Sequence, residues 1–347
     1  MDLDEAGARA RIDPCGTLTD VADPASRWRE AIAEAPVRPE LAGVDAIVVA
    51  GMGGSGFVAE VAVALARATL AVPVLALKGY ELPAFARSRT LVVGVSHSGS
   101  TEETRAVLEA AGARGCARLA VAGPGRLGVG DDVPLVPVTQ SGPPRHAIAA
   151  LLVPVLRALG LDQGEGEAIE VLEDIADRYG PAVPWAENPV KQLASRVATT
   201  DVSVAIGSEG LASAVALRYV NQLAENAKLM AIHATVPEAH HNLVVSLERS
   251  PLSGGLVELR DPRGEPDVLH RRYHAAAEAD VVPEGWWRAE FRASGRSPLA
   301  RVASLVATVD LASVYAALAL GRDPTSTGPL DRIKGALGAA SPNAEHV

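Results

Sequence analysis

Residues 96–101 (Ser-His-Ser-Gly-Ser-Thr) place four hydroxyl groups between a short apolar stretch and a helical one. Hydroxyl groups and the free amides of a helix N-terminus together form a neutral cradle for a phosphate dianion. A simpler interpretation is that one Ser or Thr caps the helix, with Glu102 or Glu103 completing a capping box. One residue would suffice for a cap, so the four hydroxyl groups predict a phosphate-binding loop.

Residues 51–56 (Gly-Met-Gly-Gly-Ser-Gly) form a second loop, between an apolar stretch and a helix expected from Phe57. They satisfy G-x-G-x-x-G, the fingerprint of dinucleotide-binding proteins. That fingerprint expects an acidic residue about 20 positions later, where this chain has Lys78, and Glu81 comes late. A nicotinamide-dependent oxidoreductase stays an alternative. The glycines also permit a tight turn, but we expect the loop's amides to face a ligand.

Three further segments carry groups that could move protons or stabilise negative charge. Glu225 lies three residues before Lys228 at the end of a predicted helix, which alone would indicate a surface ion pair. Arg145 follows two prolines and is a permanent cation, which alone would indicate a loop-capping arginine. His240 and His241 are adjacent, but no carboxylate or third histidine stands at ligand spacing, so we predict no metal site.

Together these segments resemble the sugar isomerase (SIS) domain and, more narrowly, the bifunctional phosphoglucose/phosphomannose isomerase family. The phosphate loop has His97 where the family has tyrosine, and Ser100 where asparagine is common. Neither change removes a hydroxyl group from the loop's phosphate contacts. The resemblance implies that the sugar phosphate is held by Gly54, Ser55, Ser96, Ser98 and Thr101.

The resemblance also implies a catalytic set. Residues 221–228 match the family's N-Q-x-x-E-N-x-K segment, whose glutamate is the base, so Glu225 would transfer the proton. Residues 238–242 match E-x-x-H-N, so His241 would open the sugar ring, although the extra His240 leaves the choice between the two open. In the family this histidine comes from the neighbouring subunit, which implies a homodimer.

Two cations complete that set by resemblance. Arg145 would stabilise the enediolate, and Lys334, in the C-terminal segment, would return to the substrate. The implied activity is interconversion of glucose 6-phosphate, mannose 6-phosphate, or both, with fructose 6-phosphate, without a cofactor. The alternatives are a non-catalytic sugar-phosphate sensor on the same fold, or an isomerase of a related aldose phosphate.

The elements that would position these residues alternate between apolar strands and helices, which indicates parallel sheets covered on both faces. A second unit resembles the first, and it has no counterpart to the Ser96–Thr101 loop, so we expect one phosphate site per chain. The predicted fold is α/β, with two SIS-type doubly wound parallel-sheet subdomains (αβα sandwiches). The predicted strands cover 46–50, 72–77, 90–95, 119–122, 133–138 and 202–206.

Polar, glycine-containing residues 162–167 indicate a domain boundary. We expect an N-terminal helical segment, a first SIS subdomain with the phosphate loop, linking helices, a second SIS subdomain, and a C-terminal helix with a tail. These correspond to residues 1–40, 41–160, 161–195, 196–325 and 326–347.

The composition excludes some classes of function. The 347 residues carry a net charge of -10, which argues against nucleic-acid and anionic-membrane partners. Two cysteines without a C-x-x-C pair argue against a disulfide framework. The acidic N-terminus is unlike a signal peptide, and no uninterrupted apolar run reaches about 18 residues. We therefore expect a cytoplasmic enzyme whose partner is a small sugar phosphate.

Overall fold

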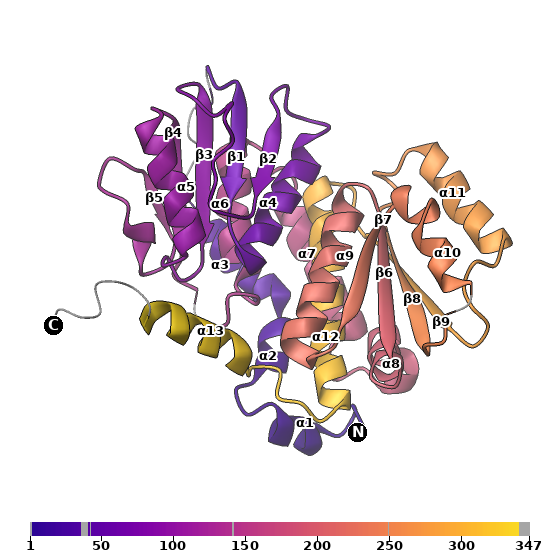
Figure 1. Cartoon of the computed structure of the whole chain (residues 1–347). Helices are drawn as coiled ribbons and strands as arrows, with labels where there is room; N and C mark the ends of the chain where they lie inside the picture. Colours follow the sequence, from indigo (N-terminus) through magenta and orange to yellow (C-terminus); the bar gives the residue numbers. More distant parts are fainter. Residues whose placement is uncertain (1, 36–40, 42, 141, 249, 340–347) are drawn as a thin grey trace.

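The computed structural model describes residues 2–35, 41, 43–140, 142–248 and 250–339. Residues 36–40 of the predicted N-terminal segment and 340–347 of the predicted tail lie outside them. Two parallel sheets stand side by side, with helices around and between them (Figure 1).

The first sheet has the strand order β2-β1-β3-β4-β5, and all its pairs are parallel. Both of its faces are buried, since Ile47 and Val49 enter one hydrophobic core while Val48 and Ala50 enter another. This explains the continuous apolar runs in the sequence, and it confirms the five predicted strands. The strands are β1 (Ala46–Ala50), β2 (Val74–Leu77), β3 (Thr90–Ser96), β4 (Ala117–Ala122) and β5 (Leu135–Pro137).

The second sheet has the order β7-β6-β8-β9 and is also parallel throughout. If β6, β7, β8 and β9 are taken in chain order as the counterparts of β1, β2, β3 and β4, this order corresponds to β2-β1-β3-β4 of the first sheet. The predicted fold of two related α/β subdomains is therefore confirmed. The strands are β6 (Val202–Ser208), β7 (Ala231–Val236), β8 (Gly254–Arg260) and β9 (Trp287–Arg292).

Helices cover both sheets and continue the chain beyond them. The α-helices are α1 (Ala6–Ile12), α2 (Thr17–Ala22), α3 (Pro24–Glu34), α4 (Gly53–Ala66), α5 (Glu102–Ala113), α6 (Ile148–Leu159), α7 (Glu165–Tyr179), α8 (Pro189–Val197), α9 (Leu211–Gln222), α10 (Leu243–Leu247), α11 (Asp267–Glu278), α12 (Pro298–Ala319) and α13 (Gly328–Ala339). Four shorter helical turns are η1 (Arg126–Gly128), η2 (Trp185–Glu187), η3 (Leu223–Ala227) and η4 (Glu238–His240).

Helix α4 begins at Gly53, four residues before the predicted start at Phe57. We predicted all the glycines of this loop as turn, but three of them, Gly53, Gly54 and Gly56, lie in the first turn of the helix. Gly51 is the residue that the tight turn requires, because a Cβ there would lie 2.8 Å from the Ser55 backbone.

Helix α12 runs through the middle of the molecule and packs against α7, α8, α9 and α2 (Figure 1). By its length and composition α12 is apolar enough to cross a membrane, although it contains no uninterrupted run of about 18 apolar residues. However, 94% of its most apolar window is buried inside the protein. A helix buried at the centre of a globular fold is apolar on all sides. The position of α12 in the core therefore explains its composition.

Candidate active site

The phosphate loop lies at the carboxyl end of β3, and its hydroxyl groups point toward one another. The Ser96 and Thr101 hydroxyl oxygens are 2.7 Å apart, and the Ser98 hydroxyl accepts hydrogen bonds from the Ser100 amide (3.2 Å) and hydroxyl (3.0 Å). Thr101 precedes α5 but makes no capping hydrogen bond through its side chain. The capping interpretation is therefore wrong for Thr101, and the hydroxyls form a cluster in front of the helix.

The glycine-rich loop at the end of β1 lies beside that cluster, because β1 and β3 are neighbours in the sheet. No side chain caps the N-terminus of α4, and Ser55 lies buried in its first turn. A Cβ on Gly54 would be 3.4 Å from the carbonyl oxygen of Pro144. Gly54 thus lets α4 approach the segment that carries Arg145.

Arg145 and Glu225, far apart in sequence, meet in the structure. The Arg145 Nη1 lies 3.5 Å from the Glu225 carboxylate. Glu225 belongs to η3, a single π-helical turn that continues α9, and 31% of its side chain is exposed. Such π-turns are frequent at functional sites. The alternative interpretation of Glu225, a surface ion pair with Lys228, is absent from the described contacts, since the Lys228 ammonium donates to the carbonyls of Asn226 and Asp323 instead.

The guanidinium of Arg145 is almost fully buried and bonded on three sides. Its Nε donates to the Asn226 side chain at 2.6 Å, and its Nη2 donates to the carbonyls of Pro324 (2.7 Å) and Thr325 (3.2 Å). Burial lowers the pKa of Arg145, and Glu225 opposes that shift. The cation is therefore held rigidly, and its remaining nitrogen, Nη1, lies toward the Glu225 carboxylate.

The main chain of Arg145 is fixed as well. Arg218 of α9 donates to the Arg145 carbonyl at 2.7 Å and forms a bidentate ion pair with Asp310 of α12 (2.8 and 2.7 Å). Asn226 in turn donates to Ser313 of α12 at 2.9 Å. We predicted no role for Arg218, Asn226 or Asp310 from the sequence. An acidic residue in the apolar stretch 298–319 was the available signal, because a buried charge needs a partner.

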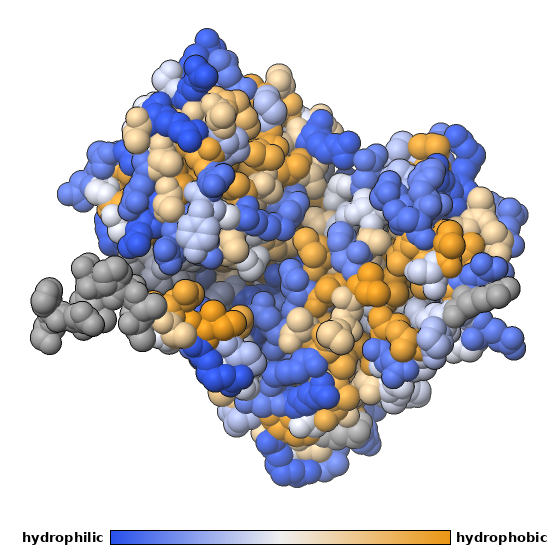
Figure 2. All heavy atoms as spheres, in the orientation of Figure 1, coloured by the Kyte–Doolittle hydropathy of each residue, from blue (hydrophilic) through white to orange (hydrophobic). Residues whose placement is uncertain are grey.

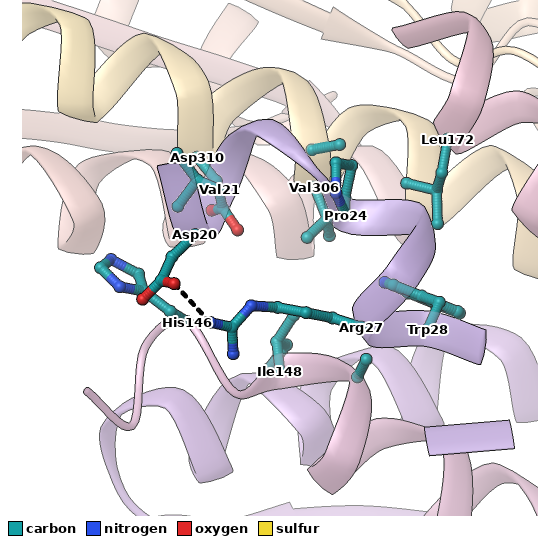
Figure 3. A pocket seen from close by; sticks show the side chains of 12 residues that line it. Asp20, Val21, Pro24, Arg27, Trp28, His146, Ile148, Leu172, Val306 and Asp310 are labelled. Carbon is teal, nitrogen blue, oxygen red and sulfur yellow. Dashed lines mark ion pairs between the residues drawn. The ribbon is translucent and has the colours of Figure 1, made fainter. Parts of the chain in front are cut away.

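His146, the residue after Arg145, lines a small cavity of about 30 Å³ together with Asp20 and Asp310 (Figure 3). Its ring is buried, and neither ring nitrogen has a hydrogen-bond partner among the described residues. Asn226 is close enough to raise the His146 pKa slightly but does not form a well-aligned hydrogen bond. Burial, followed by the charges of Arg145, Arg218 and Arg27, lowers the pKa to about 3.

His241 lies at the opposite end of the second subdomain from Glu225. Glu225 precedes β7 and His241 follows it, and a six-residue strand spans roughly 20 Å. His241 is exposed, with the Arg272 Nη2 at 3.4 Å from its Nε2, whereas His240 is half-buried with its ring edge against Tyr273. Within one chain, the structure does not bring His241 to the Arg145–Glu225 pair.

Lys334 lies on α13, and its ammonium makes no hydrogen bond or ion pair to a described residue. Helix α13 exposes Leu330, Ile333 and Leu337 on its surface. Figure 2 shows the hydrophobic surface of α13 beside a hollow that lies between this helix and the first subdomain. Lys334 therefore lies on a helix at the rim of that hollow, without contact to the other candidate residues.

Side chains beside these two loops make further contacts. His97, which stands where the family has tyrosine, has its Nε2 3.1 Å from the carbonyl oxygen of Gln140. Lys78, at the position where a dinucleotide site expects an acid, pairs with Glu60 at 2.6 Å. Among the described residues, no group of three or more His, Cys, Asp or Glu side chains could hold a metal ion.

The chain is similar in sequence to known proteins over most of its length. Residues 186–337 match the model of the bacterial phospho-glucose isomerase C-terminal SIS domain. The bifunctional phosphoglucose/phosphomannose isomerase of Aquifex aeolicus is 30% identical over 83% of this chain and 89% of the relative. The protein of the same name from Caldicellulosiruptor bescii is 29% identical over 85% and 90%. A D-glucosamine-6-phosphate 4-epimerase of Sulfolobus acidocaldarius is 28% identical over 62% and 69%.

Solved structures of similar fold agree with the two-subdomain architecture. A glucose-6-phosphate isomerase-like protein from Thermus thermophilus aligns over 96% of this chain and 99% of its own, with a TM-score of 0.63 and 22% identity. The C-terminal domain of glucosamine-fructose-6-phosphate aminotransferase from Francisella tularensis aligns over 89% and 98%, with a TM-score of 0.66 and 14% identity. At these identities the likeness shows the fold.

Proposed function

The chain belongs to the bifunctional phosphoglucose/phosphomannose isomerase family, and on this premise we propose that it interconverts glucose 6-phosphate and mannose 6-phosphate with fructose 6-phosphate. The observation that carries the proposal is the pair formed by Arg145 and Glu225, 3.5 Å apart. A base and a fixed cation side by side are what an enediolate intermediate requires.

The proposed reaction begins with the sugar phosphate bound to the first subdomain. Ser55, Ser96, Ser98 and Thr101 hold the phosphate with the α4 and α5 amides, which no side chain caps. The Glu225 carboxylate removes the proton from C2 of the open-chain aldose, and the electron pair moves into a C1–C2 double bond. The C1 oxygen becomes the enediolate oxygen, which Arg145 stabilises. The proton of the C2 hydroxyl then passes to the C1 oxygen, and the Glu225 carboxyl returns its proton to C1 as the C2 carbonyl forms, which gives the ketose.

Arg145 suits this role because its position is fixed before substrate binds. Three hydrogen bonds hold its guanidinium and one holds its carbonyl. A cation that needs no reorganisation contributes more to stabilising a transition state than a mobile one. The distant position of His241 supports a homodimer in which this histidine opens the ring bound by the partner subunit. Lys334 is the second cation that we assign to the substrate.

The decisive experiment is proton NMR of the purified protein with fructose 6-phosphate in deuterated water. We expect glucose and mannose 6-phosphates that carry deuterium at C2. Binding without products or exchange would instead support the sugar-phosphate sensor. Exchange with only one aldose, or a change of configuration at C4, would identify a different specificity.

A further inference from the structure

The second sheet has its own carboxyl edge, and one loop there corresponds to the phosphate loop of the first sheet. β8 pairs with β6 as β3 pairs with β1. Each of β3 and β8 is followed by a loop and a twelve-residue helix, α5 or α11. The residues between Arg260 and Asp267 therefore occupy the topological position of residues 97–101.

A carboxylate fills this second loop. The Glu265 side chain is 1% exposed. Its Oε1 accepts hydrogen bonds from the Ser208 hydroxyl (2.8 Å) and the Asp261 amide (2.8 Å). Its Oε2 accepts from the Nη2 of Arg260 at 2.6 Å, and the Arg260 Nε lies 3.0–3.1 Å from both oxygens.

These donors are of the kinds that bind an external anion. A hydroxyl group, a backbone amide and a guanidinium converge on one buried carboxylate. Ser208 ends β6, the counterpart of β1, and Arg260 ends β8, the counterpart of β3. The side-chain donors therefore come from the two strands that correspond to those carrying the first subdomain's loops. Burial works against ionisation of Glu265, but Arg260, Ser208 and the Asp261 amide outweigh it and lower its pKa.

We propose that Glu265 is a built-in anion, which occupies in the second subdomain the position that corresponds to the phosphate site of the first. The second anion site is thereby closed by the chain's own side chain, and each chain binds one sugar phosphate. This inference rests on the proposed function for the identity of the first site, whereas its test does not depend on catalysis.

The closed site supports a neighbouring segment. The Arg260 guanidinium lies 3.6 Å from the centre of the Tyr273 ring, and that ring meets His240 edge to face at 5.8 Å. The Tyr273 hydroxyl has no hydrogen-bond partner among the described residues. Tyr273 therefore contacts Arg260 and His240 through its ring. Glu265 therefore fixes, through Arg260, the surface that carries the adjacent His241.

The test is the thermal stability of wild type and Glu265→Ala in sodium phosphate and in sodium chloride of equal ionic strength, with saturating fructose 6-phosphate filling the first site. Glu265→Ala removes the anion shared by the guanidinium, hydroxyl and amide, and leaves Arg260 its longer pair with Glu290, 3.6 Å from the Arg260 Nη1. We expect its Tm in chloride to fall below that of wild type, and to rise with phosphate by roughly 2 °C at ten times the dissociation constant. Wild type should show no phosphate-specific rise.

Glu265→Gln is the matched control, because its amide fills the same volume and should leave no room for phosphate. Adding Ser208→Ala to Glu265→Ala should weaken the phosphate response, which would locate the ion. If Glu265→Ala is insoluble, Glu265→Ser gives the same comparison. Equal phosphate responses of wild type and the Ala or Ser variant would overturn the proposal. Failure of wild type to respond to fructose 6-phosphate would count only against the proposed function.

Discussion

At the scale of the residue, the pair of Arg145 and Glu225 combines a cation whose side chain is fixed in position with a base that is accessible to a substrate. Arg145 is 4% exposed and the Glu225 side chain 31%. A substrate can therefore reach the carboxylate, while the guanidinium beside it stays fixed by Asn226 and the 324–325 carbonyls.

We expect Glu225→Gln to lower kcat by about 10²- to 10⁴-fold, the usual contribution of a general base. The dissociation constant for fructose 6-phosphate should stay near that of wild type, because the phosphate loop lies elsewhere. Proton-exchange NMR and calorimetric titration measure the two quantities. Glu278→Gln, an exposed position on α11, should change neither. Wild-type exchange in Glu225→Gln would contradict the assignment.

His146 predicts a specific sensitivity to acid. Its pKa is about 3 in the folded protein and about 6.5 in an unfolded chain. As pH falls from 6.5 toward 3, the unfolded state therefore binds a proton that the folded state does not, and stability is lost. Between pH 7 and pH 5 this amounts to about 2 kcal/mol.

Urea unfolding at the two pH values measures this effect. The variant His146→Gln, which cannot titrate, should lose about 2 kcal/mol less than wild type over the same interval. An identical loss in both proteins would mean that His146 takes up a proton equally well in the folded state.

At the scale of the element, the π-turn η3 determines where Glu225 and Asn226 point. Asn226 accepts from Arg145 and donates to Ser313 of α12, so the turn is tied on both sides. We expect Asn226→Ala to leave Arg145 Nε unpaired and to destabilise the protein by about 1–3 kcal/mol. kcat should fall more than KM rises, because Arg145 acts on the intermediate.

Ser313→Ala provides a graded comparison for that variant, since it removes only the second bond of Asn226. Steady-state kinetics and urea unfolding should show a smaller loss than in Asn226→Ala. An equal or greater loss of kcat in Ser313→Ala would show that Arg145 does not depend on its direct bond to Asn226.

The sequence predicted the elements that have strong local signals. Buried strands appear as runs such as 46–50, and hydroxyl-rich or glycine-rich loops stand out at their ends. It could not predict that α9 would end in a π-turn, since a single turn at the end of a helix does not change the spacing of the apolar residues before it. Nor could it show that Arg218 and Asp310 pair, because they are 92 residues apart and meet only after α12 packs on α9.

At the scale of the whole molecule, the separation of Glu225 from His241 makes a sharp prediction about assembly. If His241 acts in the partner's site, a mixed dimer of Glu225→Gln and His241→Ala chains contains one complete site. Co-expressed in equal amounts, two inactive variants should give about a quarter of wild-type activity, because half the dimers are mixed and half their sites are complete.

Activity assays of the co-expressed chains, purified without selection for mixed dimers, test this prediction, and mixed dimers isolated through two different tags should reach about half of wild-type activity. Each variant alone serves as its own control. Pairing Glu225→Gln with His240→Ala asks whether the other histidine is the one required. Lack of activity in every mixture would place the ring-opening group on the same chain as Glu225.

The late position of helix α12 in the chain affects how the protein folds during synthesis on the ribosome. Its partners α2 and α7 are complete by Tyr179, but α12 ends only at Ala319. At about 5–20 residues per second, the apolar faces of the early helices stay uncovered for roughly 7–28 s before α12 is complete. These helices thus lack their partner while 319 − 179 = 140 of the 347 residues are made, and the nascent chain should depend on chaperones that hold exposed apolar surface until translation reaches α12.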